Sequence, residues 1–112
     1  IQFSNIWNDY IKTFIDYTNA KKSGDTNKVR EQLSKITSFP AKLASFYNSL
    51  NSNFSVDLVN LIFSDYSSTV KTIIDTYEVK DFKGVYMHRK VAVSQIEKIN
   101  TLISNAIENS FK

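Results

Sequence analysis

The stretch VDLVNLIFSDYSSTVKTIIDTY, residues 56–77, decides the fold. Its apolar side chains recur at alternating steps of three and four residues, at Val56, Val59, Phe63, Tyr66, Val70, Ile73 and Tyr77. This spacing places them on one face of an α-helix and is typical of helices packed in a bundle. We expect Ser55 to cap the start of the helix, with Asp57 in its first turn, where the helix dipole favours a negative charge.

Three other segments also have helical spacing of apolar side chains. The spaced residues are Phe3, Ile6, Tyr10, Phe14 and Tyr17 in the first; Val29, Leu33, Ile36, Leu43, Phe46, Tyr47 and Leu50 in the second; and Phe82, Val85, Ala92, Ile96, Ile99, Ile103 and Ala106 in the last. Gly24 can take the left-handed conformation that ends a helix, and Asp25 or Thr26 can cap the next one. We expect a polar linker over 48–53 and a cap at Asp81 before the last helix.

Pro40 lies inside the second of these segments. A proline within a helix removes one backbone hydrogen bond and costs about 3 kcal/mol unless other interactions compensate. We therefore expect a kink or a break near Ser38 and Phe39.

Two segments of the chain have similar sequences. Residues 6–13, IWNDYIKT, return as residues 62–69, IFSDYSST, an offset of 56 in a chain of 112 residues. At the same offset Asp25 matches Asp81, and Val29 matches Val85. A repeat of this length predicts two similar supersecondary units that stack on each other.

The predicted fold class is all-α: an antiparallel four-helix bundle built from two similar helical hairpins. We expect one domain over 1–112, with hairpin 1 over about 1–50 and hairpin 2 over about 55–112. The 13% of aromatic residues argue against disorder. Only 2 glycines and 1 proline are present, too few for the many tight turns of a sandwich or barrel.

The chain contains no cysteine, which excludes a disulfide scaffold and thiolate metal sites. Its longest apolar run is only a few residues, so we expect no transmembrane segment in this chain. Because it begins at Ile1 rather than Met, we expect upstream sequence, where a signal peptide or membrane anchor could stand. Such an anchor would make the protein virion- or membrane-associated.

Several motifs give the chain a family resemblance. They are Ala20-Lys21-Lys22-Ser23-Gly24-Asp25, Leu43-x-x-Phe46-x-x-x-Leu50-Asn51, Asn53-Phe54-Ser55, Asp81-x-x-x-Val85-Tyr86 and Ala106-Ile107-x-x-x-Phe111. In these it resembles a family of small all-helical proteins of bacteria and large DNA viruses, whose members are often labelled acetylglutamate kinase. The resemblance covers nearly the whole chain and corresponds to the C-terminal two-thirds of a typical member. It implies a helical fold and, from the viral members, a component of a virion or membrane-associated assembly.

The chain also departs from that family. Where the family carries histidine after an acidic residue, this sequence has Tyr10 and Tyr66, and an Asn-Ala-Asp motif is replaced within 36–41. The family's first helical hairpin has no counterpart here. No Gly-rich phosphate loop ending in Lys-Ser/Thr occurs, so the residues give the kinase label no support.

Asp9-Tyr10 and Asp65-Tyr66 occupy equivalent places in the repeat. One hypothesis makes them a shared small-ligand or cation site between helices, since bundle cores host such sites. We favour the alternative, in which the tyrosines fill the core and the aspartates are solvated or paired.

Basic residues flank both expected hairpin turns, which lie at the same end of an up-down-up-down bundle. They are Lys21, Lys22, Lys28 and Arg30 at the first turn, and Lys80, Lys83, Arg89 and Lys90 at the second. The net charge of the whole chain is only +3, so this basic pole would hold its positive excess. It could contact anionic lipid, nucleic acid or an acidic protein. We favour a solvated surface, because we expect no aromatic stacking platform beside these residues.

His88 is the only histidine, so a His-rich metal site is excluded, and no nucleophile elbow of the Gly-x-Ser-x-Gly type is present. We expect no catalytic residues, no metal and no cofactor. The function we expect is that of a non-enzymatic structural or protein-interaction module, with other proteins as its partners. The alternatives are the small-ligand or cation site and the binding of anionic surfaces by the basic pole.

Overall fold

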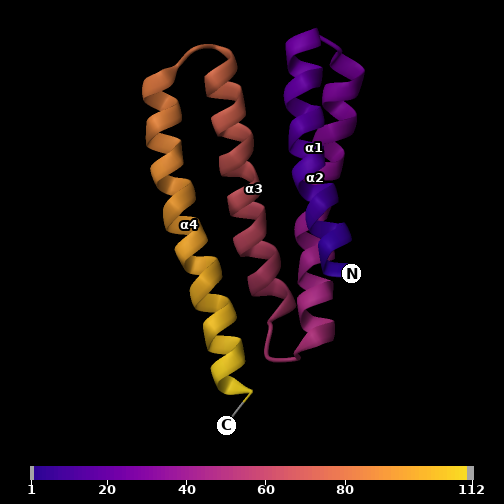
Figure 1. Ribbon diagram of the computed structural model, residues 1–112, viewed down its shortest axis with the longest axis vertical. Coiled ribbons are helices and arrows are strands. Elements are labelled where there is room, and N and C mark those ends of the chain that lie inside the picture. Colours follow the sequence, from indigo (N-terminus) through magenta and orange to yellow (C-terminus); the bar gives the residue numbers. More distant parts are fainter. Residues whose placement is uncertain (1, 111–112) are drawn as a thin grey trace. The chain divides into compact units, whose positions relative to one another are not determined.

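The structure of the chain is a computed structural model that describes residues 2–110, with side chains from Asn5 onward. Four helices follow one another: α1 (Gln2–Ser23), α2 (Thr26–Leu50), α3 (Val56–Glu78) and α4 (Phe82–Asn109). No strand occurs in the described range. Each helix runs antiparallel to the one before it (Figure 1). The prediction of an all-α fold with four antiparallel helices in two hairpins is confirmed.

The chain forms two compact units that meet inside α2. The first ends at Phe39 and contains α1 with the first part of α2; the second begins at Pro40 and contains the rest of α2 with α3 and α4. The predicted hairpin boundary lay between about 50 and 55. The last part of α2 therefore belongs with the second unit, and the assignment of a single domain stays a prediction.

The core of the first unit is aromatic. Tyr10 and Tyr17 of α1 are buried, as are Ile36 and Phe39 of α2. The ring centroids of Tyr10 and Phe39 lie 5.3 Å apart, which joins the two helices directly. Because each fully buried large apolar side chain contributes about 1.5–3 kcal/mol, this cluster supplies much of what holds the hairpin together.

A second aromatic cluster joins the end of α2 to α3. The Tyr47 ring stacks on Phe63, with centroids 6.1 Å apart and planes at 12°, and lies 5.0 Å from the ring of Phe54 in the linker. Phe54, Val59 and Phe63 are buried, and Leu43 has no exposed surface. This packing fixes the α2–α3 connection.

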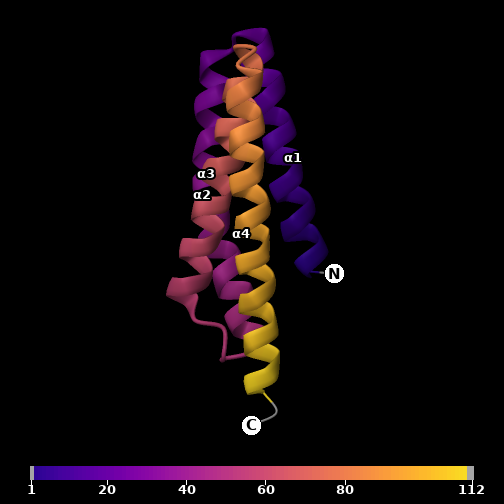
Figure 2. The same cartoon turned by 90° about the vertical axis from the view of Figure 1, so that its left-hand side faces the viewer.

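Helices α3 and α4 pair along their length (Figure 1, Figure 2). The less exposed positions of α4 recur at helical spacing, at Val85, His88, Ala92, Ile99 and Ala106. At the far end, the side-chain amide of Asn51 donates a hydrogen bond to Ser110 Oγ (2.5 Å), which ties the α2–α3 linker to the residue after α4.

The two hairpin turns share one backbone geometry. Gly24 and Lys80, separated by the repeat offset, have positive φ angles of 71° and 62°. In the first turn the N–H of Asp25 donates to Ala20 O (3.1 Å), and in the second the N–H of Asp81 donates to Thr76 O (2.9 Å). These six-residue bonds around a left-handed residue define a Schellman motif. The repeat seen in the sequence is therefore repeated in the backbone.

The predicted caps are present. Asp25 Oδ1 accepts from the backbone N–H of Lys28 (3.1 Å), and Asp81 Oδ1 accepts from that of Gly84 (2.9 Å). Ser55 Oγ accepts from the N–H of Leu58 (3.2 Å) at the start of α3. Each side chain satisfies a backbone donor that the helix itself leaves unpaired.

We predicted a kink or a break near Ser38 and Phe39. A break is wrong, because α2 continues through Pro40, and a kink stays a prediction. Phe39 and Pro40 are buried, and Leu43 and Ala44 have no exposed surface. Burial on both sides of the proline offsets the roughly 3 kcal/mol that the lost hydrogen bond and the steric clash cost.

Five residues assigned to the buried faces are exposed: Leu50, Val56, Tyr77, Phe82 and Ile96. The first four lie at or next to the end of a helix, where no neighbouring helix covers the predicted face. Ile96 lies within α4 and is 42% exposed, so helical spacing placed it on the wrong side of the core boundary. These positions are a correction to the predicted core.

Candidate functional site

Asp9 and Tyr10 of α1 point to different environments. Tyr10 is buried, and its ring lies 5.4 Å from Trp7, 5.1 Å from Phe14 and 5.3 Å from Phe39, centroid to centroid. Asp9 is exposed. In the first unit the tyrosine therefore fills an aromatic core and the carboxylate faces solvent.

Asp65 and Tyr66 of α3 differ from the first pair in burial. Asp65 is exposed and Tyr66 is half-buried. The local backbone bonding is nevertheless the same: the hydroxyl of Thr13 donates to Asp9 O (2.7 Å), and that of Thr69 donates to Asp65 O (3.0 Å). The two pairs belong to different units. A site shared between them stays a prediction.

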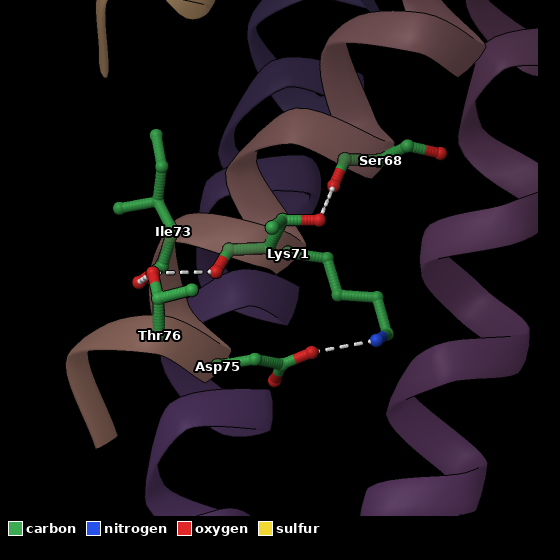
Figure 3. A network of polar contacts seen from close by, with 6 residues as sticks. Ser68, Lys71, Ile73, Asp75 and Thr76 are labelled. Carbon is green, nitrogen blue, oxygen red and sulfur yellow. Dashed lines mark hydrogen bonds and ion pairs between the residues drawn. The ribbon is translucent and has the colours of Figure 1, made fainter. Parts of the chain in front are cut away.

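The side chains around Asp75 reinforce α3. Lys71 Nζ lies 2.7 Å from Asp75 Oδ2, one helical turn away (Figure 3). The hydroxyl of Thr76, the next residue along the helix, donates to Ile73 O (3.0 Å) (Figure 3). Partly buried pairs at this spacing support a helix by a few tenths of a kcal/mol. We assign the network a structural role.

No metal centre is apparent in the described part of the chain. Among residues 2–110, no three or more histidine, cysteine, aspartate or glutamate side chains gather where they could hold a metal ion. His88 is half-buried on α4. The absence of a metal stays a prediction.

Burial and charge shift two pKa values. Burial raises the pKa of the Tyr47 hydroxyl, which lies in the aromatic cluster of the second unit. The hydrogen bond and charge of Asp16, whose Oδ2 lies 3.0 Å from Lys12 Nζ, raise the pKa of that exposed lysine. Lys12 is exposed on α1 and paired with Asp16, and Tyr47 lies among aromatic rings, so we assign both groups a structural role.

The basic residues of the first unit surround the α1–α2 turn. Lys21 and Lys22 occupy the last turn of α1, and Lys28 and Arg30 the start of α2. Lys21 Nζ lies 5.8 Å from the ring centroid of Tyr17, a cation–π contact.

The basic residues of the second unit surround the α3–α4 turn. Lys80 is the left-handed residue of the turn, and Lys83, Arg89 and Lys90 lie on the first turns of α4. Lys90 Nζ sits 4.6 Å from the ring centroid of Tyr86. Because the two clusters belong to different units, a common basic pole stays a prediction.

The α3–α4 turn carries exposed aromatic side chains, contrary to our expectation of no aromatic platform beside the basic residues. Tyr77 and Phe82 are each 61% exposed, and Tyr86 is 60% exposed. The rings of Tyr77 and Phe82 meet edge to face, with centroids 5.9 Å apart. The spacing of apolar residues predicted that Tyr77 and Phe82 are buried in the core. Their positions at helix ends were the signal in the sequence that could have indicated exposure.

A groove between α3 and α4 was also missed. Its volume is about 630 Å³. It is lined by Leu58, Leu61, Ile62 and Asp65 of α3 and by Ser94, Glu97, Lys98, Thr101, Leu102 and Asn105 of α4. The lining residues recur at helical spacing on both helices, so the groove runs along the hairpin.

Comparison with known proteins does not extend these observations. No protein-family model, curated protein or solved structure matches the chain. Within the described residues, every helix is too short or too polar to cross a membrane.

Proposed function

We propose that this chain is a non-enzymatic structural and protein-interaction module, and that the α3–α4 groove receives an amphipathic helix of a partner protein. The observation that carries the proposal is the groove itself, about 630 Å³, with Leu58, Leu61, Ile62 and Leu102 among its lining residues. Leu58 and Leu61 are 45% and 58% exposed, so apolar surface is presented to solvent along one helix face. Exposed apolar rows of this kind mark interaction sites.

The spacing of the lining residues fits a helical occupant. On α3 they fall at Leu58, Leu61, Ile62 and Asp65, two turns of one face. On α4 they extend from Ser94 to Asn105 in steps of three and four. A third helix packs into the furrow between two helices by placing its own ridges in such rows.

The polar rim favours a partner with basic residues. Asp65 and Glu97 place two carboxylates on the groove, against the single ammonium of Lys98. Complementary charge at the rim sets orientation and association rate more than affinity. The partner helix would therefore carry lysine or arginine beside an apolar stripe.

Membership in the small all-helical family of bacteria and large DNA viruses is part of this proposal. If it holds, the partner belongs to a larger viral or membrane-associated assembly. The small-ligand or cation site at Asp9, Tyr10, Asp65 and Tyr66 remains a hypothesis that thermal-shift measurements with added cations would test.

A displayed library of amphipathic helical peptides tests the groove without knowledge of the natural partner. We expect selected peptides to carry apolar residues at helical spacing with basic flanks, and to shift amide resonances of α3 and α4 along the groove. Leu61→Glu should weaken their binding at least tenfold, because burying one leucine contributes about 1.5–3 kcal/mol.

The matched control is Asn100→Glu, which adds the same charge at an exposed α4 position outside the groove lining. Its affinity for the selected peptides should stay within about twofold of the unchanged chain. Peptides that bind Leu61→Glu as well as they bind the unchanged chain, or a selection that enriches none, would overturn the proposal.

A further inference from the structure

We propose that the α3–α4 turn is a contact site for anionic phospholipid bilayers. The side chains of Tyr77, Val79 and Phe82 enter the headgroup region, and the lysines beside them bind lipid phosphates and carboxylates. This site lies at the closed end of the hairpin, whereas the groove extends toward its open end, so the two proposals can fail separately.

The turn presents a single apolar tip. Val79 is 73% exposed, the largest value among the exposed large apolar residues of the described chain. Tyr77 and Phe82 flank it, with their rings in edge-to-face contact. Tyrosine is suited to the membrane interface, because its ring is apolar and its hydroxyl can stay hydrated.

Apolar surface continues from the tip along α4. Tyr86 and Met87 are 60% and 57% exposed. Val79 and Met87 are not flat π-systems on which nucleotide bases would stack. Mixed aliphatic and aromatic exposure at a projecting turn therefore favours a bilayer over a single-stranded nucleic acid.

Charge complementarity identifies the lipid as anionic. Lys80 and Lys83 lie at the tip, and Arg89 and Lys90 follow about two turns along α4. Two carboxylates oppose them, Glu78 and Asp81, and that of Asp81 accepts the N–H of Gly84 as a helix cap. Lysine stems can lie along apolar surface while the ammonium groups reach the phosphates, as Lys90 does over the ring of Tyr86.

The backbone of the turn is suited to a poorly hydrated environment. The N–H of Lys80 donates to Tyr77 O (3.0 Å), and the N–H of Asp81 donates to Thr76 O (2.9 Å). An unsatisfied backbone group is costly where water is scarce. Because these turn donors are paired within the chain, the tip can enter the interface without breaking them.

The α1–α2 turn provides a comparison within the same molecule. It has the same Schellman bonds and is also surrounded by basic residues, among them Lys22 and Lys28. This turn has no apolar tip: between Ile15 and Leu50, where all side chains are described, no large apolar residue is exposed. A charge-only mechanism would use both turns, whereas the proposed contact needs the α3–α4 turn.

Co-sedimentation of the full chain with vesicles tests the proposal. We expect binding to vesicles of phosphatidylcholine with phosphatidylserine, and little to phosphatidylcholine alone. The double variant Val79→Ser, Phe82→Ser should bind at least about tenfold more weakly, because it removes most of the inserting apolar surface. Ile107→Ser, at an exposed α4 position near the open end, is the matched control and should bind like the unchanged chain.

Neutralising charges separates the two turns. Lys80→Gln with Lys83→Gln should weaken binding about 25-fold, from roughly 1 kcal/mol for each basic residue near an anionic surface. Lys22→Gln with Lys28→Gln should leave binding within about twofold. Equal losses from both pairs, with none from Val79→Ser and Phe82→Ser, would overturn insertion in favour of polyanion binding.

A fluorescent reporter at the tip gives a second measurement. In a Trp7→Phe background, Phe82→Trp places the only tryptophan at the turn. Its emission should shift to shorter wavelength with anionic vesicles and be quenched by brominated lipid. No vesicle binding, binding without shift or quenching, or equal affinity for a single-stranded oligonucleotide would each reject the proposal. Circular dichroism of each variant confirms that the helices remain.

Discussion

Lys80 holds a left-handed backbone conformation at the position where the first hairpin has Gly24. Glycine adopts that conformation at no steric cost, whereas a residue with a Cβ pays about 1–2 kcal/mol. The turn at Lys80 has the same two Schellman hydrogen bonds as the turn at Gly24, and these bonds maintain the backbone conformation in spite of this cost. Lys80 thus occupies a backbone conformation that its Cβ disfavours.

We expect Lys80→Gly to raise the free energy of unfolding by roughly 1 kcal/mol, because it relieves this conformation. Urea denaturation followed by circular dichroism measures the change. Lys80→Gln controls for the lost charge and should have little effect. Gly24→Ala should lower stability by a similar amount, since a Cβ there meets no heavy atom within 4 Å and only the backbone is strained. A destabilised Lys80→Gly variant would contradict the explanation.

Tyr47 makes stability depend on alkaline pH. Burial raises the pKa of its hydroxyl in the folded chain, so the folded state holds the proton more tightly than the unfolded state. The contribution of this raised pKa to the free energy of unfolding is complete below the unfolded pKa of about 10. It is lost as the pH rises through the higher pKa of the folded state. The stability difference between the unchanged chain and Tyr47→Phe should therefore change in favour of the variant above pH 10 or so. Denaturation curves at neutral and alkaline pH measure it; a constant difference would contradict it.

At the scale of the element, the spacing of apolar residues identifies the apolar face of a helix. It does not tell which part of that face another helix packs against. Phe63 and Phe82 both belong to apolar rows with helical spacing, yet Phe63 is 3% exposed and Phe82 is 61% exposed. Phe63 lies mid-helix against Tyr47, whereas Phe82 is the first residue of α4. The same residue type therefore stabilises the fold at one place and is presented to solvent at the other.

Phe63→Ala should cost about 3–5 kcal/mol, because it leaves a cavity beside Tyr47. Phe82→Ala should change stability by less than about 0.5 kcal/mol, as for an ordinary surface substitution. Thermal and chemical unfolding of the two variants gives a direct comparison. Similar losses for both would show that Phe82 is packed in solution.

The continuity of α2 through Pro40 could not be read from the sequence. The penalty of an internal proline is local and can be predicted, but the compensating burial of Phe39, Leu43 and Ala44 depends on contacts with residues distant in the chain. Caps, in contrast, depend on neighbours three residues away. The sequence accordingly predicts Ser55 and Asp81 as helix caps, and the structure confirms both.

At the scale of the whole molecule, the helix order and the repeat were predictable because both follow from periodicity along the chain. The candidate sites were less so. Asp9-Tyr10 and Asp65-Tyr66 match in sequence, but Tyr10 is buried and Tyr66 is only half-buried. The groove and the apolar tip arise from how α3 and α4 pair, which a one-dimensional pattern does not contain.

Because α2 passes from one compact unit into the other, we expect the chain to unfold in a single transition. Trp7 fluorescence reports the first unit and far-ultraviolet circular dichroism reports all helices. Their midpoints in urea should coincide, and Phe63→Ala in the second unit should move the Trp7 midpoint as well. A Trp7 curve that ignores Phe63→Ala would show that the units unfold independently.

The matching turns give the protein an internal reference. Residues 20–25 and 76–81 follow the same backbone path but display different side chains. Grafting one hexapeptide sequence onto the other turn would move its surface chemistry while keeping the frame. Any behaviour that travels with the graft then belongs to the side chains, and any that stays behind belongs to the helices that carry them.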